Sequence, residues 1–359
     1  MSVRSSVKKL LPTGVFTAVA PYGHLAEAVV QNVRYGFPAR GMKVIGVTGT
    51  NGKTSTCFLI HRMLQDAGYK TGLMTTVAYG VGEDIRPQIH HMTTVPVGEL
   101  MQRLKWMKSQ NIDWLVLETT SHALAQYRVW GVPYSVAVFT NLTHEHLDYH
   151  KTFERYREAK RRLFKLAAHN KKGLQTGIVN AEDPSAELFA NTVPHAVTYG
   201  LKSGDMRADD IVSTPEGSAF TAFYDGRELN LKVNLPGSFN VANALAAAAT
   251  GAVIGLTDEQ IERGIAALEG VEGRMTTIDE GQDFSVIVDF AHTPDSFEKL
   301  FKDLKPVVKG KLIVLFGSAG RRDEAKRAVQ GRLAGQYADE VIITEEDDRD
   351  IDGQQIMDE

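Results

Sequence analysis

A glycine-rich stretch between an apolar strand and a helix is the feature that most constrains the fold of this chain. The stretch reads VIGVTGTNGKTS and covers residues 44–55. A strand that leads through glycines into a helix is the setting of a phosphate-binding loop, usually written G-x-x-x-x-G-K-[ST]. That pattern requires a glycine five positions before Gly52, where this chain has Val47. The stretch therefore predicts a nucleotide site with an unusual loop.

Short apolar runs alternate with helical patterns along most of the chain. Predicted strands cover 43–48, 114–118 and 135–141, and predicted helices cover 54–66 and 153–168. Such alternation is typical of βαβ units, in which a parallel sheet has helices on both faces. The predicted fold class is therefore α/β, with a central P-loop mononucleotide-binding parallel sheet flanked by helices.

The pattern changes in the second half of the chain. The run AFTAFYDGRELNLKVNL predicts a hairpin that turns at Asp225-Gly226, and an alanine-rich helix is expected over 240–254. Further predicted strands cover 284–290, 311–316 and 340–344. These strands indicate a smaller Rossmann-like C-terminal α/β domain.

We expect three segments along the chain. Residues 1–42 form a reduced N-terminal segment that is too short for an independent domain, residues 43–273 form a central nucleotide-binding domain, and residues 274–359 form the C-terminal domain. The C-terminal domain is expected to be incomplete, because the sequence stops 15 residues after its last predicted strand, on entering a helix.

Composition narrows the class of protein. Of 359 residues, 43% are hydrophobic and 23% are charged, and the net charge of −4 gives no electrostatic reason to expect nucleic acid as a partner. The single cysteine, Cys57, excludes an intrachain disulfide, and its place in the apolar run CFLI predicts a buried thiol. The sequence contains no recognisable signal peptide or membrane span, so we expect a cytoplasmic protein without membrane insertion.

The glycine loop carries the side chains that phosphate binding requires. Gly49 and Gly52 let backbone N–H groups turn toward phosphate oxygens. Lys53 would reach the β- and γ-phosphates, and the Thr54 hydroxyl would hold magnesium. The N-terminus of the following helix adds its positive end. The combination of strand, spacing and helix disfavours the alternative of a glycine turn with a chance lysine.

Acidic and histidine side chains follow the next two predicted strands. Glu118 ends a buried strand at the sheet edge where α/β proteins bind ligands, and a carboxylate there needs a compensating cation, such as magnesium bound to ATP. The motif THEHLDYH then gathers His144, His146, Asp148 and His150. Clustered histidines often bind zinc, whereas the upstream nucleotide loop favours a magnesium or phosphate role. The residues alone leave both interpretations open.

A series of motifs resembles those of the Mur ligases, and most closely the MurE type, the UDP-N-acetylmuramoyl-dipeptide:amino-acid ligases of peptidoglycan synthesis. The similarity runs from about Val44 to Arg349. In chain order the motifs are GTNGKT, ETTSHAL, TNLTHEHLDYH, YREAKRRLF, PGSFNVANALAA, EGRM, VDFAHTPDSFEKLF and FGSAGRRDEAKR. This family uses the shortened loop G-T-N-G-K-T, so the resemblance accounts for Val47.

The resemblance implies an ATP-dependent amide ligase, which forms a C–N bond and releases ADP and phosphate. The γ-phosphate would pass to a carboxylate of a UDP-MurNAc-dipeptide-like substrate. The amine of an incoming amino acid, expected to be a diamino acid, would then attack the acyl phosphate. Positioning and charge neutralisation should provide most of the catalysis. The implied cofactors are ATP, two Mg²⁺ ions and a carbamate derived from CO2, and a monomer is expected.

The resemblance also implies roles for individual residues. Lys53 would contact the phosphates, Thr54 and Glu118 would bind the first magnesium ion, and His146 would bind the second. Lys160, which no spacing argument singles out, matches a lysine that CO2 carbamylates, so that it becomes a carboxylate-like ligand of the second ion. The expected nucleotide-binding positions are Gly49, Thr50, Asn51, Gly52, Lys53, Thr54, Ser55, Asn240, Asn243, Arg274, Asp289 and His292.

Other positions are expected to bind the substrates, namely Thr93, Thr94, Ser121, His122, Gln126, Arg128 and Arg349. Ser121 with His122 could instead suggest a hydrolase pair, but adjacent residues on a short segment point apart and no nucleophile elbow is present. Arg349 ends the run EDDR, where many relatives have DNPR. The extra acid could pair with a side-chain amine of the incoming amino acid, or EEDDRDID could be an exposed acidic loop.

Two other functions remain open from the sequence. A related ligase could act on a substrate without UDP, of the folylpolyglutamate, cyanophycin or poly-γ-glutamate type, and the short N-terminal segment is compatible with this alternative. The SHAL-Q-RV run favours the MurE type over these. A non-catalytic nucleotide-binding regulator is the third hypothesis, and the presence of Lys53, Glu118, His146 and Lys160 argues against it.

Overall fold

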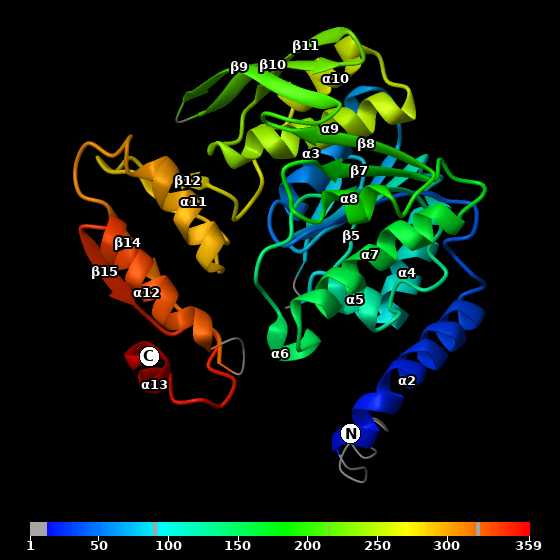
Figure 1. The fold of residues 1–359 in the computed structure, drawn as a ribbon, viewed down its shortest axis with the longest axis horizontal. Coiled ribbons are helices and arrows are strands. Elements are labelled where there is room, and N and C mark those ends of the chain that lie inside the picture. Colours follow the sequence, from blue (N-terminus) through cyan, green and yellow to red (C-terminus); the bar gives the residue numbers. More distant parts are fainter. Residues whose placement is uncertain (1–12, 89–91, 215, 321–323) are drawn as a thin grey trace.

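A mixed sheet of 11 strands forms the centre of the protein (Figure 1). The computed structural model describes residues 13–88, 92–214, 216–320 and 324–359. The strand order is β11-β10-β9-β8-β7-β6-β1-β5-β2-β3-β4. The parallel central strands are β1 (Lys43–Thr48), β2 (Thr71–Met74), β5 (Trp114–Glu118), β6 (Tyr134–Phe139), β7 (Thr176–Asn180) and β8 (His195–Gly200). The predicted parallel sheet is confirmed.

Antiparallel strands extend the sheet at both edges. One edge ends in β3 (Ala78–Val81) and β4 (Asp84–Pro87). The other continues through β9 (Met206–Thr214), β10 (Gly217–Tyr224) and β11 (Arg227–Val233). The turn between β10 and β11 is Asp225-Gly226, and both residues have positive φ, as a two-residue hairpin turn requires. The predicted hairpin is therefore confirmed.

Helices cover both faces of the sheet and bury two hydrophobic cores. On one face lie α3 (Lys53–Asp66), α9 (Phe239–Ile254) and α10 (Asp258–Ala266). On the other lie α4 (Val97–Ser109), α5 (Ser121–Ala125), α7 (Phe153–His169) and α8 (Ala186–Ala190). Strand β1 contributes to both cores, because successive side chains point to opposite faces of the sheet: Ile45 and Val47 enter the first core and Val44 enters the second. Cys57 of α3 is buried in the first core, as predicted.

The described part of the N-terminal segment begins with a long helix, α2 (Thr13–Arg34), which no sequence pattern predicts. It packs against α4, and Asn32 Nδ2 donates to the Trp130 carbonyl at 3.0 Å. Residues 1–12 lie outside the described residues. Within the described residues, no helix has the length and hydrophobicity needed to span a bilayer.

The C-terminal region forms a small α/β unit beside the large sheet (Figure 1, orange and red). Its strands are β12 (Thr276–Ile278) paired antiparallel with β13 (Val286–Val288), and β14 (Ile313–Phe316) paired parallel with β15 (Glu340–Ile343). Its helices are α11 (Pro294–Leu304), α12 (Ala325–Tyr337) and α13 (Gly353–Asp358). The predicted strand over 284–290 is too long, because its partner β12 offers only three residues for pairing.

Candidate active site

The phosphate loop connects β1 to α3 at the carboxyl edge of the parallel sheet. Gly52 has a φ of 80°, which favours glycine, and an added Cβ would collide with the Asn243 side chain. The end of β6 holds the loop, because Thr50 N donates to the Asn141 carbonyl at 2.8 Å and Asn51 N donates to Asn141 Oδ1 at 2.9 Å. Contacts with the segment that follows β6 therefore help to shape the loop.

Lys53 begins α3 and lies over this loop. Its Nζ donates to the Thr50 carbonyl at 2.7 Å. Burial lowers the pKa of Lys53, and the carboxylates of Glu118 and Glu145 oppose that change. Ser55 is buried in the same first turn of α3. A cation and a helix N-terminus thus face the same loop, which is the arrangement that binds phosphate.

Glu118 lies at the end of β5 and is almost completely buried, with 1% of its surface exposed. Its Oε2 accepts hydrogen bonds from Thr54 Oγ1 and from Thr76 N, each at 2.9 Å. Its Oε1 accepts from Thr76 Oγ1 at 3.0 Å. Thr76 belongs to the turn between β2 and β3 and was not among the predicted site residues. Both oxygens of the buried carboxylate are therefore hydrogen bonded.

The oxygen atoms around Glu118 fit a magnesium ion. Arg274 Nη2 donates to Thr54 Oγ1 at 3.0 Å, so a guanidinium also lies next to the carboxylate. Burial lowers the pKa of Arg274, and Glu118 opposes that change. A threonine hydroxyl and a carboxylate beside a phosphate loop are the hard oxygen ligands that magnesium prefers, with phosphate oxygens and water completing its shell. Thr54 and Glu118 could therefore hold the ion.

Lys160 of α7 is a buried lysine that contacts the phosphate loop. Only 2% of its surface is exposed, although α7 is rich in solvent-facing basic residues. Its Nζ donates to the Gly49 carbonyl at 2.5 Å and lies 4.5 Å from the centre of the Tyr156 ring. Burial, with a smaller effect from Lys53, holds the pKa of Lys160 well below its ordinary value.

Three histidines gather next to Lys160. The ring centre of His122 lies 4.7 Å from that of His146 and 5.3 Å from that of His150. Burial lowers the pKa of His146 to about 3 and that of His150 to about 4, so both rings are neutral at pH 7. His144 and Asp148 are exposed and lie outside this group. Within the described part of the chain, no three His, Cys, Asp or Glu side chains form a metal-binding group, which leaves the zinc interpretation unsupported.

Ser121 is bonded to one of these rings. Its Oγ lies 3.0 Å from His150 Nε2, and both residues are buried.

The asparagine pair expected on the adenine side lies against the phosphate loop. Asn243 Nδ2 donates to Asn240 Oδ1 at 2.8 Å, and Thr56 Oγ1 donates to Asn243 Oδ1 at 3.3 Å. Asn240 Nδ2 donates to the Pro236 carbonyl at 2.7 Å. Helix α9 therefore brings the Asn243 amide beside Gly52, with Asn240 bonded to it.

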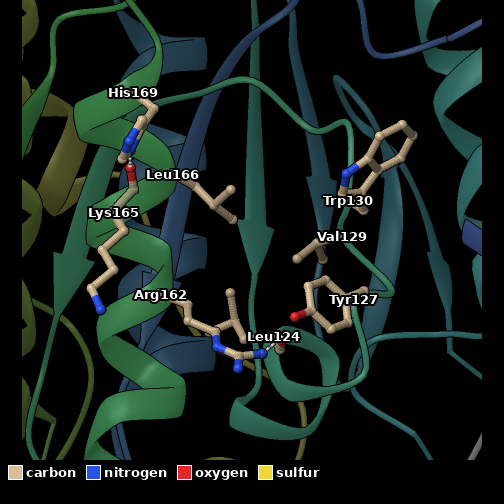
Figure 2. A pocket seen from close by; sticks show the side chains of 8 residues that line it. All are labelled: Leu124, Tyr127, Val129, Trp130, Arg162, Lys165, Leu166 and His169. Atoms are coloured by element: carbon tan, nitrogen blue, oxygen red, sulfur yellow. Dashed lines mark hydrogen bonds between the residues drawn. The ribbon is translucent and has the colours of Figure 1, made fainter. Parts of the chain in front are cut away.

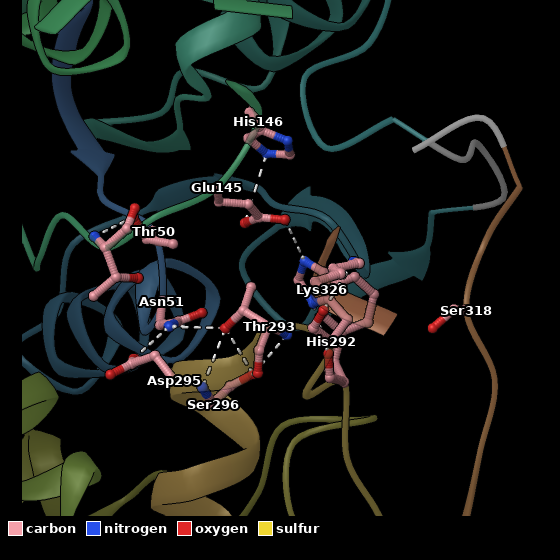
Figure 3. Close-up of polar contacts among 12 residues, drawn as sticks. Thr50, Asn51, Glu145, His146, His292, Thr293, Asp295, Ser296, Ser318 and Lys326 are labelled. Carbon is pink, nitrogen blue, oxygen red and sulfur yellow. Dashed lines mark hydrogen bonds and ion pairs between the residues drawn. The ribbon is translucent and has the colours of Figure 1, made fainter. Parts of the chain in front are cut away.

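The C-terminal unit reaches the same site through residues around His292 (Figure 3). His292 Nε2 lies 3.4 Å from Glu145 Oε1, and Lys326 Nζ donates to the His292 carbonyl at 2.9 Å. Burial would raise the pKa of Glu145, but the hydrogen bond from His292 and nearby positive charges hold it well below its ordinary value. Because His146 is held neutral by burial, we attribute this lowering mainly to His292 and Lys326.

A second contact joins the phosphate loop to α11. Asn51 Nδ2 donates to Asp295 Oδ2 at 2.9 Å and lies 3.5 Å from Thr293 Oγ1 (Figure 3). Asp289 does not reach the loop directly, because its carboxylate accepts from the backbone N–H groups of Met275 and Ala291. Glu145 and Asp295 were not among the predicted site residues. Both lie within the family motifs: Glu145 precedes the predicted His146, and Asp295 lies in the first turn of α11.

Two of the residues expected to bind the acceptor contact Glu118 or its partner Thr76. Thr93 Oγ1 lies 2.9 Å from Thr76 Oγ1, and Thr94 Oγ1 donates to the Glu118 carbonyl at 3.3 Å. Arg128 donates to the Thr94 carbonyl. Gln126 and Arg128 line a cavity of about 130 Å³ with residues of α2. The structure therefore brings these positions together.

Arg349 is the exception among the predicted substrate residues. Its Nε donates to Asp347 Oδ2 at 2.7 Å, within its own loop. Residues 345–348 are exposed, as the interpretation of EEDDRDID as an exposed acidic loop requires. No hydrogen bond among the described residues joins Arg349 to the acceptor positions.

A second cavity lies away from the predicted residues, between α7 and the loop that follows α5 (Figure 2). It has a volume of about 300 Å³. Its lining is mainly apolar, with a rim of basic side chains, and consists of Leu124, Tyr127, Val129, Trp130, Arg162, Lys165, Leu166 and His169. None of these residues belongs to the predicted site.

Comparison with known proteins accounts for both parts of this site. Residues 47–251 match the Mur ligase middle domain, and residues 273–359 match the domain described as Mur ligase, glutamate ligase domain. A UDP-N-acetylmuramyl-tripeptide synthetase of Roseiflexus sp. (strain RS-1) is 42% identical over 344 residues, which are 92% of this chain and 67% of that protein.

Two further relatives carry diaminopimelate ligase names. The UDP-N-acetylmuramoyl-L-alanyl-D-glutamate--2,6-diaminopimelate ligase of Bacillus velezensis is 38% identical over 96% of this chain and 71% of its own length. A solved structure of a ligase with the same name superposes with a TM-score of 0.66 at 31% identity, over 89% of this chain and 65% of that one. This chain thus spans about two thirds of the length of these relatives. From these matches, the chain belongs to the Mur ligase family and to its MurE type.

Proposed function

We propose that this chain is an ATP-dependent ligase that adds diaminopimelate or lysine to a UDP-MurNAc-dipeptide in peptidoglycan synthesis. The observation that carries the proposal is the environment of Glu118. Thr54 of the phosphate loop bonds to this carboxylate from one side, and Thr76, which also contacts Thr93, bonds to it from the other. Transfer of a phosphoryl group from ATP to an acceptor requires such a junction between the two substrate sites.

The loop residues provide the first part of the chemistry. Lys53 and the α3 N-terminus neutralise charge on the phosphates, which favours attack by the acceptor carboxylate. Thr54 and Glu118 would hold magnesium, which supplies further positive charge at the transferred group. Arg274 approaches the same place from the C-terminal side. These residues act by positioning and charge, and none of them forms a covalent bond with the substrate.

Lys160 is proposed to act as a carbamate together with His146. The neutral amine is the form that reacts with CO2: a new N–C bond forms and the amine loses a proton. Burial favours that neutral form by lowering the pKa of Lys160. The resulting anion would place oxygen ligands for a second magnesium ion beside the neutral His146 ring. The bare lysine cation would repel that ion.

The acceptor and the incoming amino acid are assigned to different regions. Thr93, Thr94, Gln126 and Arg128 are proposed to bind the muramoyl peptide, with Ser121 and His122 at the same edge. Arg349 is proposed to bind the carboxylate of the incoming amino acid, and the acids before it to bind its distal amine. A positively charged side chain on the amino acid matches the exposed acids at 345–348.

We also propose that residues 43–273 and 274–359 act as two domains that close on the nucleotide. The hydrogen bond from Asn51 to Asp295 and the contact between Glu145 and His292 cross this boundary beside the phosphate loop. Closure of this kind completes the site and excludes water from the acyl phosphate.

The test is phosphate release from ATP with UDP-MurNAc-L-Ala-D-Glu as the acceptor. Lysine, diaminopimelate, ornithine and a neutral amino acid are supplied in parallel, and the product is identified by mass spectrometry. Glu118→Gln, which removes the charge and keeps the shape, is the inactive control. Release that requires both the acceptor and one diamino acid supports the proposal. Nucleotide binding without release for any combination overturns it and favours an acceptor without UDP.

A further inference from the structure

Thr76 lies where the nucleotide side and the acceptor side of the site meet. Strands β2 and β5 are parallel neighbours, and their register pairs Met74 with Leu117. The turn that follows β2 therefore emerges at the same sheet edge as Glu118, one residue beyond Leu117. This topology fixes Thr76 next to the buried carboxylate.

Thr76 contacts both oxygens of that carboxylate. Its backbone N–H donates to Glu118 Oε2 at 2.9 Å, and its hydroxyl donates to Oε1 at 3.0 Å. Two donors from one residue fix the rotation of a carboxylate, because turning it would break both bonds. The same Thr76 hydroxyl lies 2.9 Å from Thr93 Oγ1.

The number of available hydrogens sets the direction of these bonds. A hydroxyl has one hydrogen to donate and two lone pairs to accept with. Thr76 must donate to Glu118, which accepts every hydrogen bond described for its side chain. Thr76 is also the donor in the contact with Thr93, so Glu118 Oε1 and Thr93 Oγ1 share one hydroxyl hydrogen. Thr93 therefore competes with the carboxylate for that hydrogen.

The turn does not need the Thr76 hydroxyl for its own stability. The preceding residue, Thr75, stabilises the turn, because its N–H and its Oγ1 donate to the Ala78 carbonyl at 2.8 and 2.9 Å. Thr75 Oγ1 also accepts from Ala78 N at 3.1 Å. The Thr76 hydroxyl, in contrast, bonds to Glu118 and Thr93.

We propose that Thr76 is a positioning residue that couples the acceptor-binding residue Thr93 to Glu118. Binding of the acceptor at Thr93 orders the Thr93 hydroxyl, which orders the Thr76 hydroxyl and the carboxylate that faces the nucleotide. This inference rests on the proposed function for the identity of the acceptor. To the proposed function it adds a role for Thr76 and a coupling between the nucleotide site and the acceptor site.

The experiment is a double-mutant cycle on Thr76 and Thr93, with valine at each position singly and together. Binding of UDP-MurNAc-L-Ala-D-Glu is measured by calorimetry without ATP or magnesium, and kcat and KM for the acceptor are measured in the complete reaction. Thr76→Val keeps the shape and the backbone N–H and removes only the hydroxyl. Thr76→Ser retains the hydroxyl, and Thr221→Val on β10 is the control for a threonine-to-valine change outside the site.

Thr76→Val is expected to lower kcat/KM for the acceptor by about 10- to 100-fold, the range for a lost hydrogen bond to a charged group. Thr76→Ser should recover most of this loss. In the calorimetry, Thr76→Val should weaken acceptor binding in the wild-type background and have no effect when Thr93 is valine. Equal effects in both backgrounds, or none in either, would overturn the coupling. If the wild-type protein binds the acceptor but releases no phosphate, the proposed function fails while the calorimetric cycle still decides the role of Thr76.

Discussion

Replacing His61 by leucine should remove much of the sensitivity of this protein to mild acid. His61 lies on α3 with 3% of its surface exposed, and neither ring nitrogen makes a hydrogen bond of normal geometry within the described residues. Burial lowers its pKa from 6.5 to about 4, with a backbone group of Gly82 opposing and the charge of Arg62 adding to the change. As the pH falls, His61 of the unfolded chain therefore binds a proton near pH 6.5, whereas in the folded protein it does so only near pH 4.

The size of the effect follows from this difference. Stability contributed by the neutral ring is complete above pH 6.5 and is lost as the pH falls toward 4. Each pKa unit corresponds to about 1.4 kcal/mol of unfolding free energy, so a pKa difference of about 2.5 amounts to a loss of about 3 kcal/mol once the pH is well below 4. At pH 5 about 2 kcal/mol of this is already lost. His61→Leu replaces the ring by a side chain of similar volume that takes up no proton.

Urea denaturation at pH 7.5 and pH 5.0 measures the difference. The wild-type protein should lose about 2 kcal/mol more than His61→Leu between these two pH values. His195→Leu, at an exposed position of β8, is the control and should follow the wild type. Parallel losses in the wild type and His61→Leu would show that the ring is not buried as a neutral group.

The remaining predictions concern the nucleotide site. Lys160→Met should leave ATP binding measured by calorimetry unchanged and reduce phosphate release by on the order of 100-fold or more; undiminished release would exclude the carbamate from the mechanism. Gly52→Ala should cost about 1–2 kcal/mol in thermal denaturation, because alanine disfavours positive φ and its Cβ would meet Asn243. Asp295→Ala breaks the bond to Asn51 and should raise the KM for ATP by about 5- to 10-fold, equivalent to about 1 kcal/mol; an unchanged KM would show that this contact does not assist closure.

The elements of the central sheet could be predicted because their signals are local. The runs KVIGVT and WLVLE are apolar and end at chemically distinctive residues, and they form β1 and β5 with the predicted bounds. Helix α2 gives no comparable signal, since Pro21 lies inside it and proline normally argues against a helix interior. Its position depends on packing against α4, which a local pattern does not contain.

The same contrast between local signals and contacts between distant elements applies to the site. The phosphate-loop residues are adjacent in sequence, so their joint role can be inferred from spacing. Thr76 and Glu145 acquire their roles only when distant elements meet, Thr76 beside Glu118 and Glu145 beside His292. The burial of Lys160 is likewise invisible in a helix with several other, less buried basic residues, and only the family resemblance identified that lysine.

The single thiol of the protein gives access to motions of the nucleotide-binding helix. Cys57 lies on α3, one turn after the phosphate loop, with none of its surface exposed, and burial raises its pKa. A thiol reagent can modify it only when α3 separates from the sheet, so the rate of modification counts those rare openings. With one cysteine in the chain, the signal needs no engineered label. A ligand that binds at the start of α3 should slow the reaction by a factor that grows exponentially with the free energy with which it holds the helix in place.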